Sequence, residues 1–259
     1  MSDRVSIAVD GGIADVRLTR ADKMNALDPA MFAAIGAAID TLAERTDVRC
    51  VVLSGEGRAF CAGLDMASMQ AGGSGTGVER NDQGAILPQH VTWGWRNLPV
   101  PVIAAVHGVA FGGGFQIMSG ADIRIATPDA RFAIRETYWG LVPDMAGFAI
   151  WRGLVRDDVL RELVYTAREF DAAEAIGHGF VTRTAADPHA AAMALARDIA
   201  AKSPHAIRGA KRLCNMAHDA DSRAMLEAET AEQLKVIGLP NMMEQVRAHM
   251  EKREATFMD

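Results

Sequence analysis

Residues 109–123 (VAFGGGFQIMSGADI) place three consecutive glycines, Gly112 to Gly114, in front of an apolar stretch with a helical pattern. Glycine destabilises a helix by about 1 kcal/mol relative to alanine, so three of them are costly where a buried helix begins. Glycines also let a ligand approach the backbone closely. The first turn of a helix offers unpaired N–H groups and a partial positive charge, which suit an oxygen that becomes negative. A plain tight turn between a strand and a helix explains the same triplet.

A second glycine turn, CAGLD at residues 61–65, could supply another N–H group from the opposite side. Two backbone donors that converge on one oxygen form an oxyanion hole, and loss of one such donor typically costs about a hundredfold or more in rate. The two turns together predict a site that stabilises negative charge on a carbonyl oxygen.

Hydrophobic periodicity predicts the elements that would hold these turns. Alternation over residues 5–9 and 13–18, around a DGG turn, predicts a hairpin. Asp28 as N-cap and Pro29 as the first helical residue predict the start of a helix. We further expect buried strands within residues 49–55, 101–108 and 122–129, a helix around Trp93 and Trp95, and a flexible segment at residues 71–84.

From about Pro188 onward the pattern is helical. Apolar positions of this region, such as Leu226, Val246 and Met250, suit packing against the core or against another subunit. The sequence therefore predicts an α/β core over residues 1–200 and an all-helical region over residues 201–259.

Composition argues against several classes of protein. The net charge is −6 and no basic tract could follow phosphates, so no nucleic-acid partner is expected. Three cysteines without CxxC spacing are typical of a reduced, cytoplasmic protein. The apolar run at residues 98–121 contains Pro99, Pro101 and His107, so no membrane span is expected there.

Other signals are weaker than their structural alternatives. The segment GSGTGV at residues 73–78 follows no strand and lacks the spacing of a dinucleotide-binding loop, and Ser74 lacks the frame of a serine hydrolase. Cys214 and His218 stand four apart without a second ligand pair, so no metal site is expected. Met66, Met69, Trp139 and Met145 could be core residues or walls of an apolar pocket.

The longer motifs together resemble the crotonase, or enoyl-CoA hydratase/isomerase, superfamily. They are KMNALDPAM (23–31), GRAFCAGLD (57–65), the segment from PVIAAVHG to RFAIRE (101–136), GLVPDMAG (140–147) and EFDAAEAIGHGFVTR (169–183). The resemblance covers nearly the whole chain. It implies an α/β fold, a crotonase-like spiral of ββα units, followed by a C-terminal helical region that builds a homotrimer or a dimer of trimers.

By this resemblance, the oxyanion donors are the backbone N–H groups of Ala62 and Gly113, which would hold the thioester oxygen of an acyl-CoA. Coenzyme A is then part of the substrate, and no separate cofactor is expected. Two segments resemble the CoA-binding loops of the family, which use mostly backbone contacts. Their residues are Asn25, Ala26 and Leu27 in the first, and Ala62, Gly63, Leu64 and Asp65 in the second.

Gln116 and Glu136 occupy the two positions at which members of the family that add water to enoyl-CoA usually carry glutamates. A neutral amide cannot accept a proton near pH 7, although it can hold a water molecule or the thioester. Glu136 is then the only residue of the usual pair that can act as general acid or base.

Asp144 lies eight residues after Glu136, where classical hydratases have a glycine. Dienoyl-CoA isomerases resemble this chain in having an acid at that spacing, but they have an aspartate in place of Gln116. Aryl-CoA dehalogenases place a nucleophilic aspartate near the same position. The structural alternative for Asp144 is a turn or N-cap residue ahead of residues 145–155.

We therefore expect an acyl-CoA enzyme that transfers a proton through Glu136, assisted by Asp144. Isomerisation of a double bond needs only one shuttling carboxylate, so it fits these residues more easily than hydration, which would need Gln116 to position the water. Two alternatives remain: a non-catalytic acyl-CoA-binding protein, and a hydrolase or dehalogenase that uses Asp144 as nucleophile.

Overall fold

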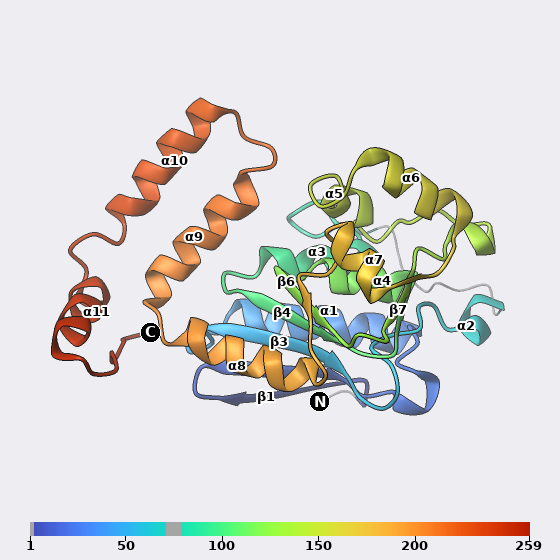
Figure 1. Ribbon diagram of the computed structural model, residues 1–259, viewed down its shortest axis with the longest axis horizontal. Coiled ribbons are helices and arrows are strands. Elements are labelled where there is room, and N and C mark those ends of the chain that lie inside the picture. The colour runs from blue at the N-terminus through green and yellow to red at the C-terminus, as the bar shows by residue number, and fades with distance from the viewer. Residues whose placement is uncertain (1–2, 71–78) are drawn as a thin grey trace.

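The computed structural model of the protein describes residues 3–70 and 79–259. Its main sheet lies in the lower part of the molecule as drawn in Figure 1. Its order is β1-β2-β3-β4-β6-β9, with an antiparallel first pair and parallel neighbours thereafter. The strands are β1 (Val5–Asp10), β2 (Ile13–Leu18), β3 (Cys50–Gly55), β4 (Val102–Val106), β6 (Ile123–Ala126) and β9 (Arg183–Thr184).

Helices cover both faces of this sheet, as parallel strands require. Val51 and Leu53 of β3 face the cluster that includes α1 (Pro29–Ala43), whereas Val52 between them packs towards α8 (Pro188–Ala200). The alternation along one strand thus separates the two layers of the core. The predicted hairpin, the helix start at Asp28 and the strands within residues 49–55, 101–108 and 122–129 are all confirmed.

A second, three-stranded sheet carries the glycine-rich turn. It has the order β5-β7-β8, in which β5 pairs parallel to β7 and β8 pairs antiparallel to it. Its strands are β5 (Val109–Phe111), β7 (Arg131–Ala133) and β8 (Phe170–Asp171). Phe115 of the following helix packs against Phe132, Phe170, Phe180 and Trp151, with ring centroids 5.1 to 6.1 Å apart. This aromatic cluster fixes α4 (Gly113–Ser119) against the sheet.

The remaining helices of the body are α2 (Met66–Gln70), α3 (Leu87–Asn97), α5 (Gly147–Trp151), α6 (Asp157–Thr166) and α7 (Ala172–Gly177), with short 3₁₀ turns at Ala21–Lys23 and Thr137–Trp139. Residues 71–78 of the segment expected to be flexible lie outside the described residues. At the end of that segment, the Asn81 side chain accepts hydrogen bonds from the backbone of Gln83 and Ala85 and closes a turn, and its flexibility stays a prediction.

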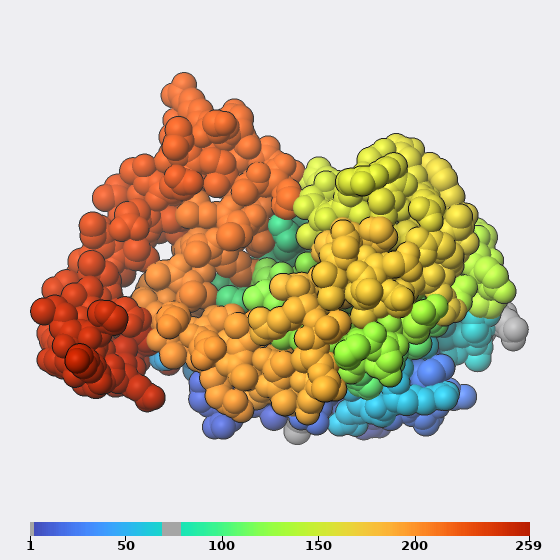
Figure 2. Space-filling view, in the orientation of Figure 1, coloured from blue at the N-terminus to red at the C-terminus, as the bar shows by residue number. Residues whose placement is uncertain are grey.

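The last three helices form an arm at one side of the body, at the left of Figure 2. They are α9 (Pro204–Met216), α10 (Ser222–Leu234) and α11 (Pro240–Glu251). Lys211 anchors the arm: its buried ammonium donates to the Val100 carbonyl (2.7 Å) and to Asp122 (2.8 Å). Large apolar side chains of the arm remain exposed, namely Leu226, Leu234, Ile237, Met243, Val246 and Met250. Among the described residues, no helix combines the length and apolar character that a membrane crossing needs.

Candidate active site

A cavity of about 770 Å³ opens where both glycine turns meet the end of β7. This is the size of a pocket for a small ligand. The backbone of residues 62–65 and 111–113 forms one part of its wall, and Glu136 and Asp144 form another. The apolar part of the wall includes Met24, Phe32, Met66, Trp139, Val142 and Met145. Of the residues that the sequence left open between core and pocket, Met66, Trp139 and Met145 are thus pocket residues, and the Met69 side chain lies outside the described parts.

Each of the three glycines has a separate structural reason. Gly112 has φ +49° and ψ −119°, a backbone conformation that other residues rarely adopt. Gly113 begins α4 and lines the cavity, and its N–H group has no hydrogen-bond acceptor among the described residues. A Cβ atom on Gly114 would lie 2.4 Å from the Cys61 carbonyl oxygen, so only glycine fits there. The triplet therefore brings the first turn of α4 against the CAGLD turn.

The prediction of Ala62 as a backbone donor is wrong, and Leu64 is the candidate donor in the same turn. The Ala62 N–H group donates to the Met24 carbonyl at 2.9 Å, so it is already used within the fold. The Leu64 N–H group has no acceptor among the described residues, and Leu64 lines the cavity.

The direction of the Leu64 amide follows from its neighbours. Leu27 donates to the Gly63 carbonyl (2.8 Å) and accepts from the Asp65 amide (3.0 Å), so the chain at Leu64 forms a short parallel bridge. Successive backbone groups of an extended chain point to opposite sides, so the Leu64 N–H group points away from Leu27. A Cβ atom built on Gly63 would lie 3.8 Å from the Gly113 nitrogen, which places the two turns side by side.

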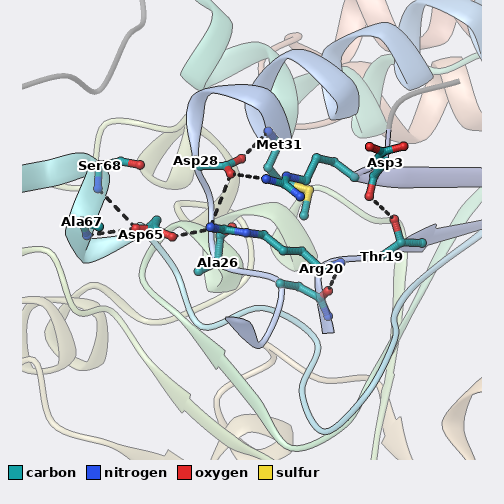
Figure 3. Close-up of polar contacts among 11 residues, drawn as sticks. Asp3, Thr19, Arg20, Ala26, Asp28, Met31, Asp65, Ala67 and Ser68 are labelled. Carbon is teal, nitrogen blue, oxygen red and sulfur yellow. Dashed lines mark hydrogen bonds and ion pairs between the residues drawn. The ribbon is translucent and has the colours of Figure 1, made fainter. Parts of the chain in front are cut away.

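Arg20 lies between Asp65 of the CAGLD turn and Asp28 (Figure 3). Its guanidinium pairs with Asp65 at 2.6 Å and with Asp28 at 3.5 Å. Asp65 accepts from the amides of Ala67 and Ser68 at the start of α2, and Asp28 accepts from the Met31 amide at the start of α1. The Arg20 guanidinium holds the pKa of Asp65 below its ordinary value. One partly buried cation thus joins the starts of two helices to the turn that carries Leu64.

Glu136 follows β7 and is only 7% exposed. Its Oε1 atom accepts a hydrogen bond of 2.5 Å from the Gln116 amide, and its buried Oε2 atom has no partner among the described residues. Burial raises the pKa of Glu136 above the usual range of a glutamate, and the charge of Asp144 raises it further. Glu136 therefore lines the cavity with one carboxyl oxygen held by Gln116 and the other buried without a partner.

Gln116 lies behind Glu136 and does not line the cavity. The side chain is completely buried, and its carbonyl oxygen accepts from the amides of Met145 and Gly147, each at 3.0 Å. This placement does not support the hydration alternative, in which Gln116 would position a water molecule. Its contact is with Glu136.

Asp144 lines the same cavity as Glu136. The N-cap alternative is wrong, because Ala146 occupies that position before α5 and no side chain caps the helix. Partial burial raises the pKa of Asp144 above its ordinary value. Two carboxyl groups with raised pKa values therefore share one cavity, which is a common feature of sites that transfer protons.

The residues expected to bind CoA divide into two groups. Ala26, Ala62, Gly63, Leu64 and Asp65 line the cavity. Asn25 and Leu27 are buried and do not line it.

Asn25 instead fastens the first loop. Its side chain accepts from the Arg20 amide and donates to the carbonyls of Glu56 and Ala59, while its own φ is +55°. It is a structural residue of the loop.

Arg135 is a cavity residue that the sequence reasoning missed. Its guanidinium stacks over Phe111 at 5.2 Å and over Tyr138 at 5.3 Å, and it pairs with Glu169. These partners come from three separate segments, so no local pattern could have indicated them. Within residues 3–70 and 79–259, no group of three His, Cys, Asp or Glu side chains could hold a metal ion.

The geometry defines a site that can hold a carbonyl oxygen between backbone amides beside a buried carboxylate. Residues 8–259 match the family model described as enoyl-CoA hydratase/isomerase. The chain is 32% identical over 257 residues to the mitochondrial delta(3,5)-delta(2,4)-dienoyl-CoA isomerase of Mus musculus, covering 92% of this chain and 76% of that protein.

It is also 32% identical over 249 residues to the enoyl-CoA hydratase EchA19 of Mycobacterium tuberculosis, covering 94% of this chain and 92% of that one. The crystal structure of an enoyl-CoA hydratase from Bacillus anthracis has a TM-score of 0.89 at 27% identity and matches 98% of both chains. The chain belongs to the enoyl-CoA hydratase/isomerase family, and the predicted crotonase-like α/β fold with C-terminal helices is confirmed. A cytoplasmic location stays a prediction, since the mouse relative is mitochondrial.

Replacement of Arg20 by Met should lower the free energy of unfolding by about 3 kcal/mol at pH 7, because the buried Asp65 carboxylate loses its ion-pair partner, whereas Asp28 keeps its pair with Arg4. The pKa of Asp65 is lowered in the folded protein, so this stabilisation is present above the pKa of the unfolded chain and is lost as the pH falls through the folded value. Urea unfolding at pH 7 and near pH 3 measures both effects. The control is Arg45→Met, which breaks an exposed, solvent-screened pair with Asp47 and should change the stability much less. Equal losses in the two variants at pH 7 would contradict the assigned role of Arg20.

Proposed function

We propose that this protein moves a carbon–carbon double bond along the acyl group of an enoyl-CoA or dienoyl-CoA thioester. One observation carries the proposal: Glu136, which has an unpaired carboxyl oxygen, and Leu64 and Gly113, which have unpaired N–H groups, line one cavity. An acyl-CoA substrate agrees with the family to which the chain belongs.

The reaction begins when the thioester oxygen accepts hydrogen bonds from the amides of Leu64 and Gly113. Glu136 removes a proton from the carbon beside the thioester, or from the vinylogous carbon, and the electron pair moves onto the thioester oxygen. The two amides stabilise this enolate more strongly than the neutral carbonyl, which lowers the barrier. The proton then returns to a different carbon from Glu136 or from Asp144, so the double bond has moved and no atom is gained or lost.

The environment of Glu136 suits this task. Burial raises its pKa towards the working pH, so the carboxylate is a stronger base than an exposed glutamate. Asp144 has a raised pKa in the same cavity and can serve as the second acid or base.

The contact between Gln116 and Glu136 favours isomerisation over hydration. The donor and acceptor atoms are 2.5 Å apart, so no water molecule fits between them. Gln116 also lies outside the cavity wall, where it cannot hold a water molecule against the substrate. The relatives of the chain include proteins named for each reaction, so the preference rests on this contact.

We also propose that the arm of α9 to α11, within residues 201–259, joins copies of the chain into a homotrimer or a dimer of trimers. Its support is the row of large apolar side chains that a lone chain leaves exposed, of which Met250 is 79% exposed.

Substitution of Glu136 by Gln should reduce proton exchange by about a thousandfold, because the amide keeps the shape but cannot accept a proton. Asp144→Asn should cost about tenfold to a hundredfold. The measurements are deuterium uptake from heavy water into a bound acyl-CoA and conversion of 3-enoyl-CoA to 2-enoyl-CoA. In the wild type, the rate should fall as the pH drops below the raised pKa of Glu136, because only the ionised carboxylate accepts a proton.

Three results would contradict this function. If the wild type takes up no deuterium with any acyl-CoA, the protein binds acyl-CoA without catalysis. Full loss in Asp144→Asn with an unaffected Glu136→Gln variant would favour a nucleophilic aspartate. Faster hydration of 2-enoyl-CoA than isomerisation of 3-enoyl-CoA would reverse the preference between the two reactions.

Introduction of Glu at both Val246 and Met250 should dissociate the oligomer, because charges would be buried in an apolar contact. Sedimentation velocity measures the mass of the assembly in solution. Arg223→Glu, at an exposed position of α10 that is not apolar, is the control and should leave the mass unchanged. A monomeric wild type would refute the proposed assembly.

A further inference from the structure

Three hydrogen bonds of Gln116 connect Glu136 to the turn that carries Asp144. Its Nε2 atom donates to Oε1 of Glu136 at 2.5 Å, and its Oε1 atom accepts from the amides of Met145 and Gly147. The side chain is completely buried, so water cannot replace these partners. One amide thus contacts both segments that supply a carboxylate to the cavity.

The chemistry of the partners fixes which way the Gln116 amide faces. The amides of Met145 and Gly147 are donors only, so the atom that meets them must be the carbonyl oxygen. The NH₂ group must then face Glu136, whose ionised carboxylate is an acceptor only. A flipped amide would break all three hydrogen bonds.

The turn after Asp144 depends on this support. Ala146 has φ +67°, a left-handed conformation that is unfavourable for a residue other than glycine. The amides on both sides of Ala146 are the two that Gln116 accepts from. The Asp144 side chain has no hydrogen bond to another described residue, so the backbone of the turn places it.

We propose that Gln116 is a positioning residue that holds one oxygen of Glu136, and so the orientation of its carboxyl group at the cavity, and fixes the Asp144 turn with its carbonyl. The inference rests on the proposed function for its kinetic consequences, whereas its effect on the Glu136 carboxyl group can be measured without turnover. A glutamate at position 116 would instead place a second carboxylate against Glu136, and the two would compete for one proton.

Among the neighbours of Glu136, Gln116 is a side chain that favours its ionised form. Asp144 raises the pKa of Glu136, so it opposes ionisation. The other charged residues that line the cavity are Lys23, Asp65 and Arg135, of which Asp65 pairs with Arg20 and Arg135 pairs with Glu169. The Gln116 hydrogen bond acts in the opposite direction to Asp144 and favours the ionised base.

The first test replaces Gln116 by Met, which has a similar volume but neither donor nor acceptor. Loss of the hydrogen bond to the ionised carboxylate should move the acidic limb of the kcat/KM profile upward by about one to two pH units. The value of kcat should fall by about tenfold or more, with little change in KM, because Gln116 does not touch the substrate. The control is Ser119→Ala, because Ser119 lies on the same helix as Gln116. This change removes the buried hydrogen bond that Ser119 accepts from Trp151 and should leave the acidic limb in place. An unmoved limb in Gln116→Met would overturn the proposal.

The second test exchanges the two side chains in the double variant Gln116→Glu, Glu136→Gln. The same amide–carboxylate hydrogen bond can form, and the charge of the pair is unchanged, but the carboxylate now lies outside the cavity wall. Thioester binding should persist while deuterium exchange falls by about a thousandfold. Wild-type exchange in this double variant would overturn the proposal.

Infrared spectroscopy separates this inference from the proposed function. The C=O stretch of a protonated carboxyl group, assigned to Glu136 by its absence in Glu136→Gln, can be titrated in the wild type and in Gln116→Met without substrate. A higher titration midpoint in Gln116→Met supports the positioning role even if the wild type turns over no acyl-CoA. Coincident midpoints would overturn it even if the enzyme is an active isomerase.

Discussion

The site depends on two backbone N–H groups, those of Leu64 and Gly113, that the fold leaves without partners at a cavity. Unpaired backbone donors are unfavourable in a folded protein, so they persist only where the surrounding structure is strong enough to hold them. Here, a parallel bridge at Leu27 fixes one amide and the glycine turn fixes the other. Arg20 ties the first turn to two helix starts, and the aromatic cluster around Phe115 holds the second. Glu136 and Asp144 line the same cavity as these two amides.

Much of the fold followed from local patterns. The hairpin, the Asp28 cap and the buried strands have the correct types because each is set by periodicity, a turn or a cap within a few residues. The short strands β5, β7, β8 and β9 have two or three residues each, too few for a period to be visible. The resemblance to a known family supplied the overall topology, which the solved structures confirm.

The candidate site was only partly visible in the sequence. Glu136, Asp144 and Gly113 do line one cavity. The choice of Ala62 was wrong because nothing in CAGLD reveals that the Met24 carbonyl already uses that amide. The sequence also could not show that the Gln116 carbonyl is already used, because its partners, Met145 and Gly147, come from a turn some thirty residues further along the chain. Which polar group is free and which is used is a property of tertiary pairing, and no local pattern encodes it.

The most direct measurement replaces the Leu64 amide by an ester, through incorporation of the corresponding α-hydroxy acid, and compares the rate of proton exchange with that of the wild type. This change removes one N–H group and keeps the leucine side chain. If the Leu64 amide stabilises the enolate, kcat/KM should fall by about a hundredfold or more. The loss should be much smaller when the same change is made at Ala62, whose N–H group is bonded to Met24. Unchanged exchange in the Leu64 ester, or a larger loss at Ala62, would contradict it.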